Sequence, residues 1–163
     1  MQIVWHYTIE VCFQGIVAAG QIEPAGLYVE ERERLGVWFS RHPTWEPTAT
    51  KGIVDASTYP ASRWATRKEM LELGLARIGV DAAGLSTWVQ HRKVSGVSAA
   101  MARRLVLSAA ERGANPGDWL VHYGPVPRAM WIAVQRWEGA GWRDGPMPTR
   151  EARDLTSNAV CIT

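Results

Sequence analysis

The sequence predicts a single α+β domain. Strand-like runs occur early and late in the chain with helical patterns between them, which favours α+β over a doubly wound parallel sheet. A length of 163 residues with 47% hydrophobic composition suits one domain with a real core and is too short for two ordinary ones. We therefore expect one domain over residues 1–147 and a polar tail that could dock on it over residues 148–163.

The N-terminal quarter is expected to form strand, helix and strand. Residues 2–7 (QIVWHY) are typical of a strand, and Thr8 is expected to cap a helix over residues 8–19. Gly20 then ends that helix as a left-handed residue. The run GVWFS, residues 36–40, predicts the second strand.

The rest of the chain continues this mixture. T-R-K-E from Thr66 has the form of a capping box, so a helix is expected over residues 67–73. The Ala-, Met- and Leu-rich stretch 98–112 is the clearest helix in the sequence. Three further strand-like runs are LARIGV at 75–80, GDWLVHYGP at 117–125 and RAMWIAVQRW at 128–137, the last followed by a turn and a short final strand.

Composition excludes several classes of protein. The formal charge of +2 comes from 18 basic and 16 acidic residues, and the basic ones form no tract, so non-specific nucleic-acid binding is not favoured. The chain contains neither a phosphate-binding glycine loop nor H-E-x-x-H, and its histidines lack zinc-ligand spacing, so we expect no metal. No run approaches the roughly 18 apolar residues of a membrane span, so we expect a soluble cytoplasmic protein with no membrane partner. Cys12 and Cys161 are expected to be reduced thiols.

The segment W-H-Y-T places His6 and Thr8 near the end of the first strand. An imidazole and a hydroxyl there can hydrogen-bond a sugar hydroxyl or an adenine edge. The alternative is a His6 that is satisfied by a neighbouring backbone carbonyl.

Three segments in order resemble the ADP-ribosyltransferase fold. They are H-Y-T at 6–8, G-Q-I-E-P at 20–24 and G-V-W-F-S at 36–40 with the loop PTWEPTATK after it. The resemblance covers about the first 52 residues and extends to the diphtheria-toxin-like, poly-ADP-ribose-polymerase-like and RNA 2′-phosphotransferase-like branches. It implies split antiparallel β-sheets with flanking helices, and NAD as the substrate.

The resemblance also implies roles for individual residues. His6 would bond the adenosine ribose, and Trp38 would stack on nicotinamide in place of the family's Tyr. Arg41 would bind the pyrophosphate, and Trp45 could close over a base. The remaining implied cofactor-binding residues are Tyr7, Thr8, Ser40 and His42.

The family's third motif is where this sequence departs. A catalytic Glu is expected on a late strand, and the alignment puts Met130 or Gln135 there instead. Gln135 can bond a ribose hydroxyl but carries no charge. Glu138 falls on the opposite face by strand alternation unless a bulge intervenes. His6, Trp38, Gln135 and Glu138 are therefore the candidate catalytic residues.

Two functions from different classes follow. The first is an NAD-dependent ADP-ribosyltransferase, a toxin or effector that modifies a protein or nucleic-acid target. The second is a non-catalytic module of the same fold that binds NAD, ADP-ribose or a nucleotide. A weaker third is an unrelated α+β interaction domain whose aromatic residues form the core. The family assignment requires that His6 and Trp38 face one cleft.

Overall fold

The computed structural model describes residues 1–24, 29–54 and 62–148. Its four helices in the described residues are α1 Glu10–Ala19, α2 Arg67–Glu72, α3 Trp88–Val94 and α4 Ala99–Glu111. The 3-10 turns are η1 Pro116–Asp118 and η2 Arg128–Met130. The strands are β1 Ile3–Ile9, β2 Gln21–Ile22, β3 Gly36–Ser40, β4 Gly52–Val54, β5 Ser62–Trp64, β6 Leu75–Asp81, β7 Ser86–Thr87, β8 Trp119–Tyr123, β9 Val126–Pro127, β10 Ala133–Glu138 and β11 Gly141–Asp144.

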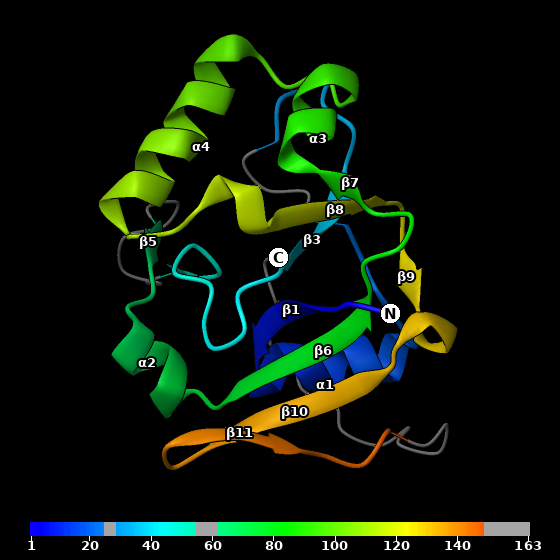
Figure 1. Cartoon of the computed structure of the whole chain (residues 1–163). Coiled ribbons are helices and arrows are strands. Elements are labelled where there is room, and N and C mark those ends of the chain that lie inside the picture. The colour runs from blue at the N-terminus through cyan, green and yellow to red at the C-terminus, as the bar shows by residue number, and fades with distance from the viewer. Residues whose placement is uncertain (25–28, 55–61, 149–163) are drawn as a thin grey trace.

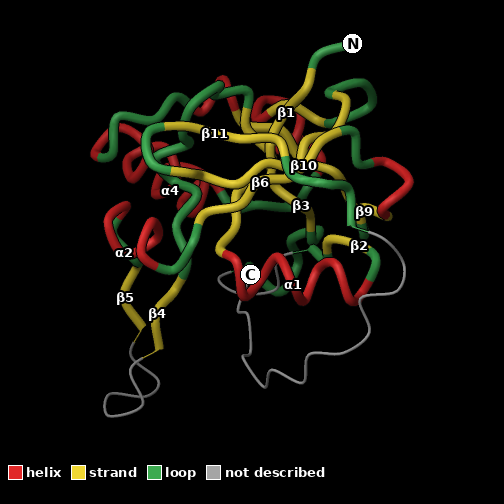
Figure 2. The backbone as a smooth tube through the Cα atoms, turned by 90° about the horizontal axis from the view of Figure 1, so that it is seen from below, coloured by secondary structure: helices red, strands yellow, loops and turns green. Residues whose placement is uncertain are grey.

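Seven strands form one antiparallel sheet in the order β11-β10-β6-β1-β3-β8-β7. Two short pairs, β2 with β9 and β4 with β5, lie outside it. Figures 1 and 2 show α1 against the part of the sheet that contains β1, β6 and β10, while Figure 1 shows α3 and α4 next to β8. The α+β class predicted from the sequence is confirmed at this level.

The sheet is barely continuous between β1 and β3. Trp5 opposite Ser40 is the one register pair between these strands. By contrast, β1 pairs with β6 at seven positions and β3 pairs with β8 at five. The sheet therefore consists of two well-paired parts, β11-β10-β6-β1 and β3-β8-β7, that diverge beyond a single contact. We call this place the β1–β3 junction.

Local signals set several element ends. The Thr66 and Glu69 capping box is confirmed, and the helix expected over residues 98–112 forms as α4, with Ser98 as its N-cap. The cap expected at Thr8 is wrong, because Thr8 still belongs to β1 and α1 begins at Glu10 with no side-chain cap. The strand expected from residue 128 begins at Ala133, because residues 128–130 turn as η2.

The two faces of the sheet follow from its register. Residues opposite each other, or two apart on one strand, share a face. One face, which we call the α1 face, carries His6, Phe39, Ile78 and Val134. The other face, which we call the loop face, carries Tyr7, Trp38, Arg77 and Gln135.

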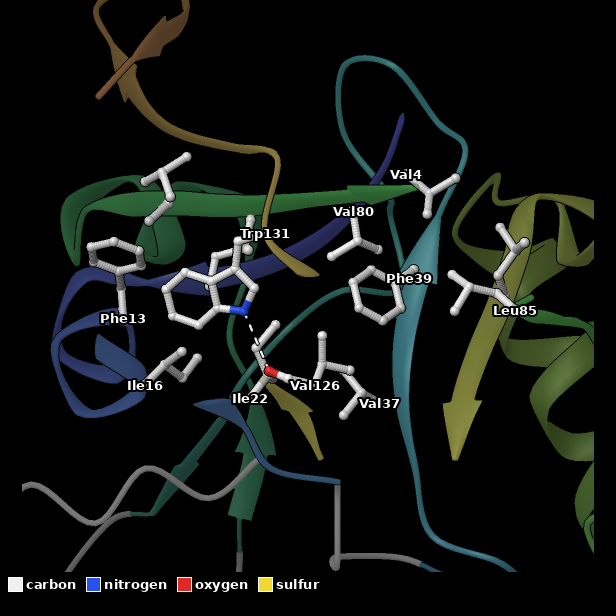
Figure 3. Packing of buried hydrophobic residues seen from close by; sticks show 14 of the residues in the cluster. Val4, Phe13, Ile16, Ile22, Val37, Phe39, Val80, Leu85, Val126 and Trp131 are labelled. Atoms are coloured by element: carbon white, nitrogen blue, oxygen red, sulfur yellow. Dashed lines mark hydrogen bonds between the residues drawn. The ribbon is translucent and has the colours of Figure 1, made fainter. Parts of the chain in front are cut away.

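The main core lies on the α1 face and joins both parts of the sheet (Figure 3). Phe13 and Ile16 of α1 belong to it, as do Val80 of β6 and Phe39 of β3. Trp131 is anchored there by its Nε1, which donates to the Val126 carbonyl at 3.3 Å. The loop face is covered by two smaller clusters, one around Trp5 and Tyr7 and one around Trp88 and Trp119.

Other expectations have mixed outcomes. Cys12 is disulfide-bonded, so the reduced thiol expected there is wrong, while Cys161 lies outside the described residues. The proposed tail lies outside them too, apart from Pro148. Within the described ranges, no helix has the length and apolar character needed to cross a bilayer.

Candidate functional site

His6 occupies the β1–β3 junction. Its Nδ1 lies 3.0 Å from the backbone oxygen of Trp38, and its ring lies 5.9 Å from that of Phe39. Burial lowers the pKa of His6 to about 3, with a smaller contribution from the positive charge of Lys51, while the bond to the Trp38 carbonyl opposes the shift. A carbonyl can only accept, so the neutral ring donates from Nδ1 and keeps a lone pair on Nε2.

That lone pair has no partner. His6 Nε2 and Thr8 Oγ1 are both buried without a hydrogen bond, as are His91 Nε2 and Trp119 Nε1 outside β1. The two residues are two apart on β1 and so lie on the same side of it. Buried polar atoms without partners are rare and cost about 1–3 kcal/mol each. This pair therefore marks a place where a water or a polar group of a ligand is expected to bind.

Lys51 adds positive charge near His6. Burial lowers the pKa of its ammonium to about 8, which is the response of a cation without a compensating carboxylate. No ion pair to Lys51 occurs in the part of the chain that the structure describes. The junction thus combines a neutral acceptor, a hydroxyl and a cation.

Ser40 is already engaged on the other strand. Its hydroxyl donates to the buried Glu46 carboxylate at 2.7 Å and accepts from the His42 backbone N–H at 3.0 Å. Thr48 closes the same turn, because its hydroxyl and N–H both donate to Glu46, at 2.6 and 3.2 Å. Ser40 therefore holds the loop after β3, which leaves the ligand role implied for it unsupported by this geometry.

Trp38 does not share a cleft with His6. Its half-buried ring packs against His91 at 4.9 Å and against Trp88 and Trp119 at 6.1 Å, on the loop face. His6 contacts Phe39, which alternates with Trp38 along β3 and points to the α1 face. The expectation that both rings line one cleft is wrong for this structure, because of that alternation.

Gln135 lies on the loop face, in register with Arg77. Its Oε1 accepts from Arg77 Nε at 2.8 Å and Nη2 at 2.5 Å, and its Nε2 donates to Asp144 Oδ1 at 2.8 Å. The guanidinium of Arg77 lies between the rings of Trp5 and Trp142, at 3.9 and 4.3 Å. Gln135 is thus a fully used partner of a buried cation.

The same cation fixes the loop after β3. Arg77 Nη1 donates to the Pro43 carbonyl at 2.7 Å, and the Tyr7 hydroxyl donates to the His42 carbonyl at 2.7 Å. Burial raises the pKa of Tyr7, with Arg77 opposing the shift, so its hydroxyl remains a donor. Trp45 packs edge-on against Tyr7 at 5.4 Å and is buried. Trp45 is a core residue in this structure, unlike the expected cover over a base.

The structure also places three other candidates, Arg41, His42 and Glu138. Arg41 Nη1 donates to the Gly117 carbonyl at 3.2 Å. His42 Nδ1 accepts from two backbone N–H groups of its own turn, those of residues 44 and 45. Glu138 is exposed and lies on the face opposite Gln135, as strand alternation predicted, because β10 and β11 pair without a bulge through Gln135 and Glu138.

Sequence reasoning missed several residues of this region. Arg77 was read only as part of a strand, and nothing local showed that its guanidinium would be buried. Glu46 and Lys51 lie in the quoted loop, yet only the fold brings them to Ser40 and His6. Across the described ranges, no three His, Cys, Asp or Glu side chains gather as a metal site.

Comparison with known proteins finds no matching family model, no matching curated protein and no matching solved structure. The resemblance of the three segments therefore carries its implications only as a proposal.

Proposed function

We propose that the chain binds NAD or ADP-ribose at the β1–β3 junction. The observation that carries the proposal is the unpartnered Nε2 of His6, buried where the two parts of the sheet diverge. The neutral acceptor suits a ribose hydroxyl, which is a donor. Lys51 supplies a cation for the pyrophosphate.

Access to the junction requires a small opening, because His6 and Thr8 are buried. Because β1 and β3 share one register pair, separating them breaks fewer backbone hydrogen bonds than separating any other neighbouring strands of the sheet. Trp38 has no part in this version of the site, since its ring lies on the loop face.

Replacing His6 by Ala is expected to weaken NAD and ADP-ribose binding by about two- to twelvefold, the loss of one hydrogen bond. Titration calorimetry on the purified chain measures the affinity. His122→Ala is the matched control, because His122 also bonds a carbonyl, that of Gly124, but stands on β8. Absence of binding by the wild type, or an equal loss in both variants, would refute the proposal.

ADP-ribosyl transfer is the second candidate, favoured by Gln135 and Trp38 lying on one face. Transfer requires charge stabilisation as nicotinamide leaves, and a neutral amide gives less of it than a carboxylate. The Arg77 cation beside Gln135 opposes a developing positive charge further. The geometry thus supports binding more strongly than catalysis.

We expect slow release of nicotinamide by the wild type and faster release by Gln135→Glu. The assay follows nicotinamide by chromatography, with Gln2→Glu at an exposed position as the control. A vigorous wild type that loses activity in Glu138→Ala but keeps it in Gln135→Ala would move the catalytic role to Glu138.

A further inference from the structure

The helices α3 and α4 carry a concentration of positive charge. Residues 86–112 contain five of the 18 Lys and Arg residues and one of the 16 Asp and Glu residues, which leaves 13 basic and 15 acidic residues elsewhere. The chain is thus nearly neutral as a whole, but basic residues exceed acidic ones by four in this stretch, while acidic residues exceed basic ones by two elsewhere. Figure 1 shows that pair beside β8, at one end of the molecule.

Four of these cations have no internal role. Arg92 and Lys93 in the last turn of α3, and Arg103 and Arg104 in α4, are exposed. Within the described ranges none of them forms an ion pair or a side-chain hydrogen bond, unlike Arg136, which pairs with Glu10. Their charge is available to a partner.

Apolar side chains lie among these cations. Leu107 and Val89 are about three-fifths exposed, at 60% and 62%, and Val94 and Val106 are exposed too. Leu107 follows Arg103 by four residues and Arg104 by three, so these side chains are neighbours on α4. We call the eight residues the α3–α4 surface: Val89, Arg92, Lys93, Val94, Arg103, Arg104, Val106 and Leu107.

α4 carries apolar side chains on its outer side as well as on its inner side. Ala102, Leu105 and Ala109 pack with Trp88 and Trp119, while Val106 and Leu107 are exposed. A helix that serves only its own core confines its larger apolar residues to the inner side. The exposed Val106 and Leu107 therefore indicate a surface that packs against another molecule.

We propose that the α3–α4 surface docks an acidic amphipathic segment of another protein. Carboxylates complement the four unpaired cations, and apolar side chains of the segment complement the valines and Leu107. Nucleic acid fits less well, because its bases stack on aromatic side chains and the exposed apolar groups here are aliphatic. A second copy of the chain is disfavoured, because the same face would meet its own positive charge.

The inner side of these helices packs with Trp88, Trp119 and Trp38 in one cluster, so the partner would bind on the side away from Trp38. The inference does not depend on NAD binding, because none of the eight residues belongs to the β1–β3 junction.

The test selects ligands from a phage library of random 16-residue peptides against the whole chain. We expect enriched sequences with Asp or Glu and with Leu, Ile, Met or Phe at helical spacing. For a synthetic peptide of the enriched sequence, fluorescence anisotropy should show about tenfold weaker binding to Arg103→Glu/Arg104→Glu and to Val106→Ser/Leu107→Ser. A peptide with Lys in place of its acidic residues should regain affinity for the Arg103→Glu/Arg104→Glu variant.

The matched control is Lys68→Glu/Arg143→Glu, which changes the net charge equally at two exposed positions outside α3 and α4. Circular dichroism checks that every variant is folded. The proposal is overturned if no acidic amphipathic sequence is enriched, or if the control weakens binding as much as the α3 and α4 variants do. It is overturned in favour of nucleic acid if a 20-base-pair DNA duplex binds more tightly than the peptide and depends on the same arginines.

Discussion

At the scale of single residues, His6 uses one ring nitrogen in a hydrogen bond to the backbone and leaves the other ring nitrogen without a partner. Its Nδ1 donates to the Trp38 carbonyl, in place of a backbone hydrogen bond between β1 and β3. A bond of this kind to a backbone carbonyl was the alternative role expected for this histidine. Its Nε2 is buried and forms no hydrogen bond. One side chain thus secures the junction and presents an acceptor there.

Burial of a neutral His6 predicts sensitivity to acid. The folded-state pKa of about 3 lies below the ordinary 6.5, so the unfolded chain binds the proton more readily. The stabilisation is complete above pH 6.5 and is lost as the pH falls towards 3, at about 1.4 kcal/mol for each pH unit. Lowering the pH from 7.5 to 5 should therefore reduce the unfolding free energy by about 2 kcal/mol through protonation of His6 in the unfolded chain.

Urea denaturation at both pH values measures this loss, and His6→Gln, which cannot titrate, provides the reference. The carboxylates and His91 are common to both proteins, so the difference between the two losses reports His6. Equal losses in wild type and variant would show that His6 is not buried in its neutral form.

At the scale of elements, side chains of the sheet hold the loop after β3. Arg77 reaches the Pro43 carbonyl from β6, and Trp142 of β11 donates to the Thr44 carbonyl at 2.6 Å. The loop therefore depends on two strands that follow it in the chain. Its polar composition suggested ligand binding, whereas much of its hydrogen bonding is internal.

Replacing Arg77 by Met should free this loop. The substitution keeps apolar bulk between Trp5 and Trp142 but leaves Gln135 and the Pro43 carbonyl without their donor. We expect a loss of about 3 kcal/mol of unfolding free energy, and faster hydrogen exchange at residues 42–45. Denaturant unfolding and exchange mass spectrometry measure the two effects.

Arg136→Met is the matched control, because the ion pair of Arg136 with Glu10 is about one-third exposed on both sides. Solvent screening limits its loss to about 1 kcal/mol or less. If Arg77→Met lowers the unfolding free energy no more than Arg136→Met does, the central role given to Arg77 is contradicted.

At the scale of the whole molecule, the sheet is divided but the core is not. One register pair links β1 to β3, yet the cluster on the α1 face contains Val4 of β1, Val37 and Phe39 of β3, and Leu120 of β8. The hydrophobic core therefore joins the two parts where the backbone ladder does not. We expect them to unfold together.

Phe39→Ala tests this coupling. Removing this ring, which is 2% exposed, should lower the unfolding free energy by about 3–5 kcal/mol. Both parts of the sheet should still unfold in one common transition. Near-ultraviolet circular dichroism reports the packing of the tryptophans in both parts of the sheet, and far-ultraviolet dichroism reports the whole backbone. Leu107→Ala, at an exposed position, should change the stability by no more than about 0.5 kcal/mol. Two separate transitions in Phe39→Ala would show that the two parts fold independently.

Local sequence alone predicted a good part of the fold. The Thr66 and Glu69 box and the left-handed Gly20 act within a few residues, so one end of α2 and one end of α1 could be read directly, and α4 was recognised from its composition. Alternation also placed Glu138 and Gln135 on opposite faces correctly. Thr8 misled, because a capping residue type can equally well finish a strand.

The tertiary structure decided how the candidate site is assembled. His6 meets Trp38 across 32 residues, and Arg77 meets Gln135 across 58. Local patterns do not specify which strands become neighbours or in which register they pair. A register shift of one residue exchanges the two faces of a strand. The sequence by itself therefore determined several of the elements and named the candidate residues, but it did not show α3 or the turn before β10. Strand pairing alone decided that His6 and Trp38 point apart, and that the backbone of the sheet divides beside His6.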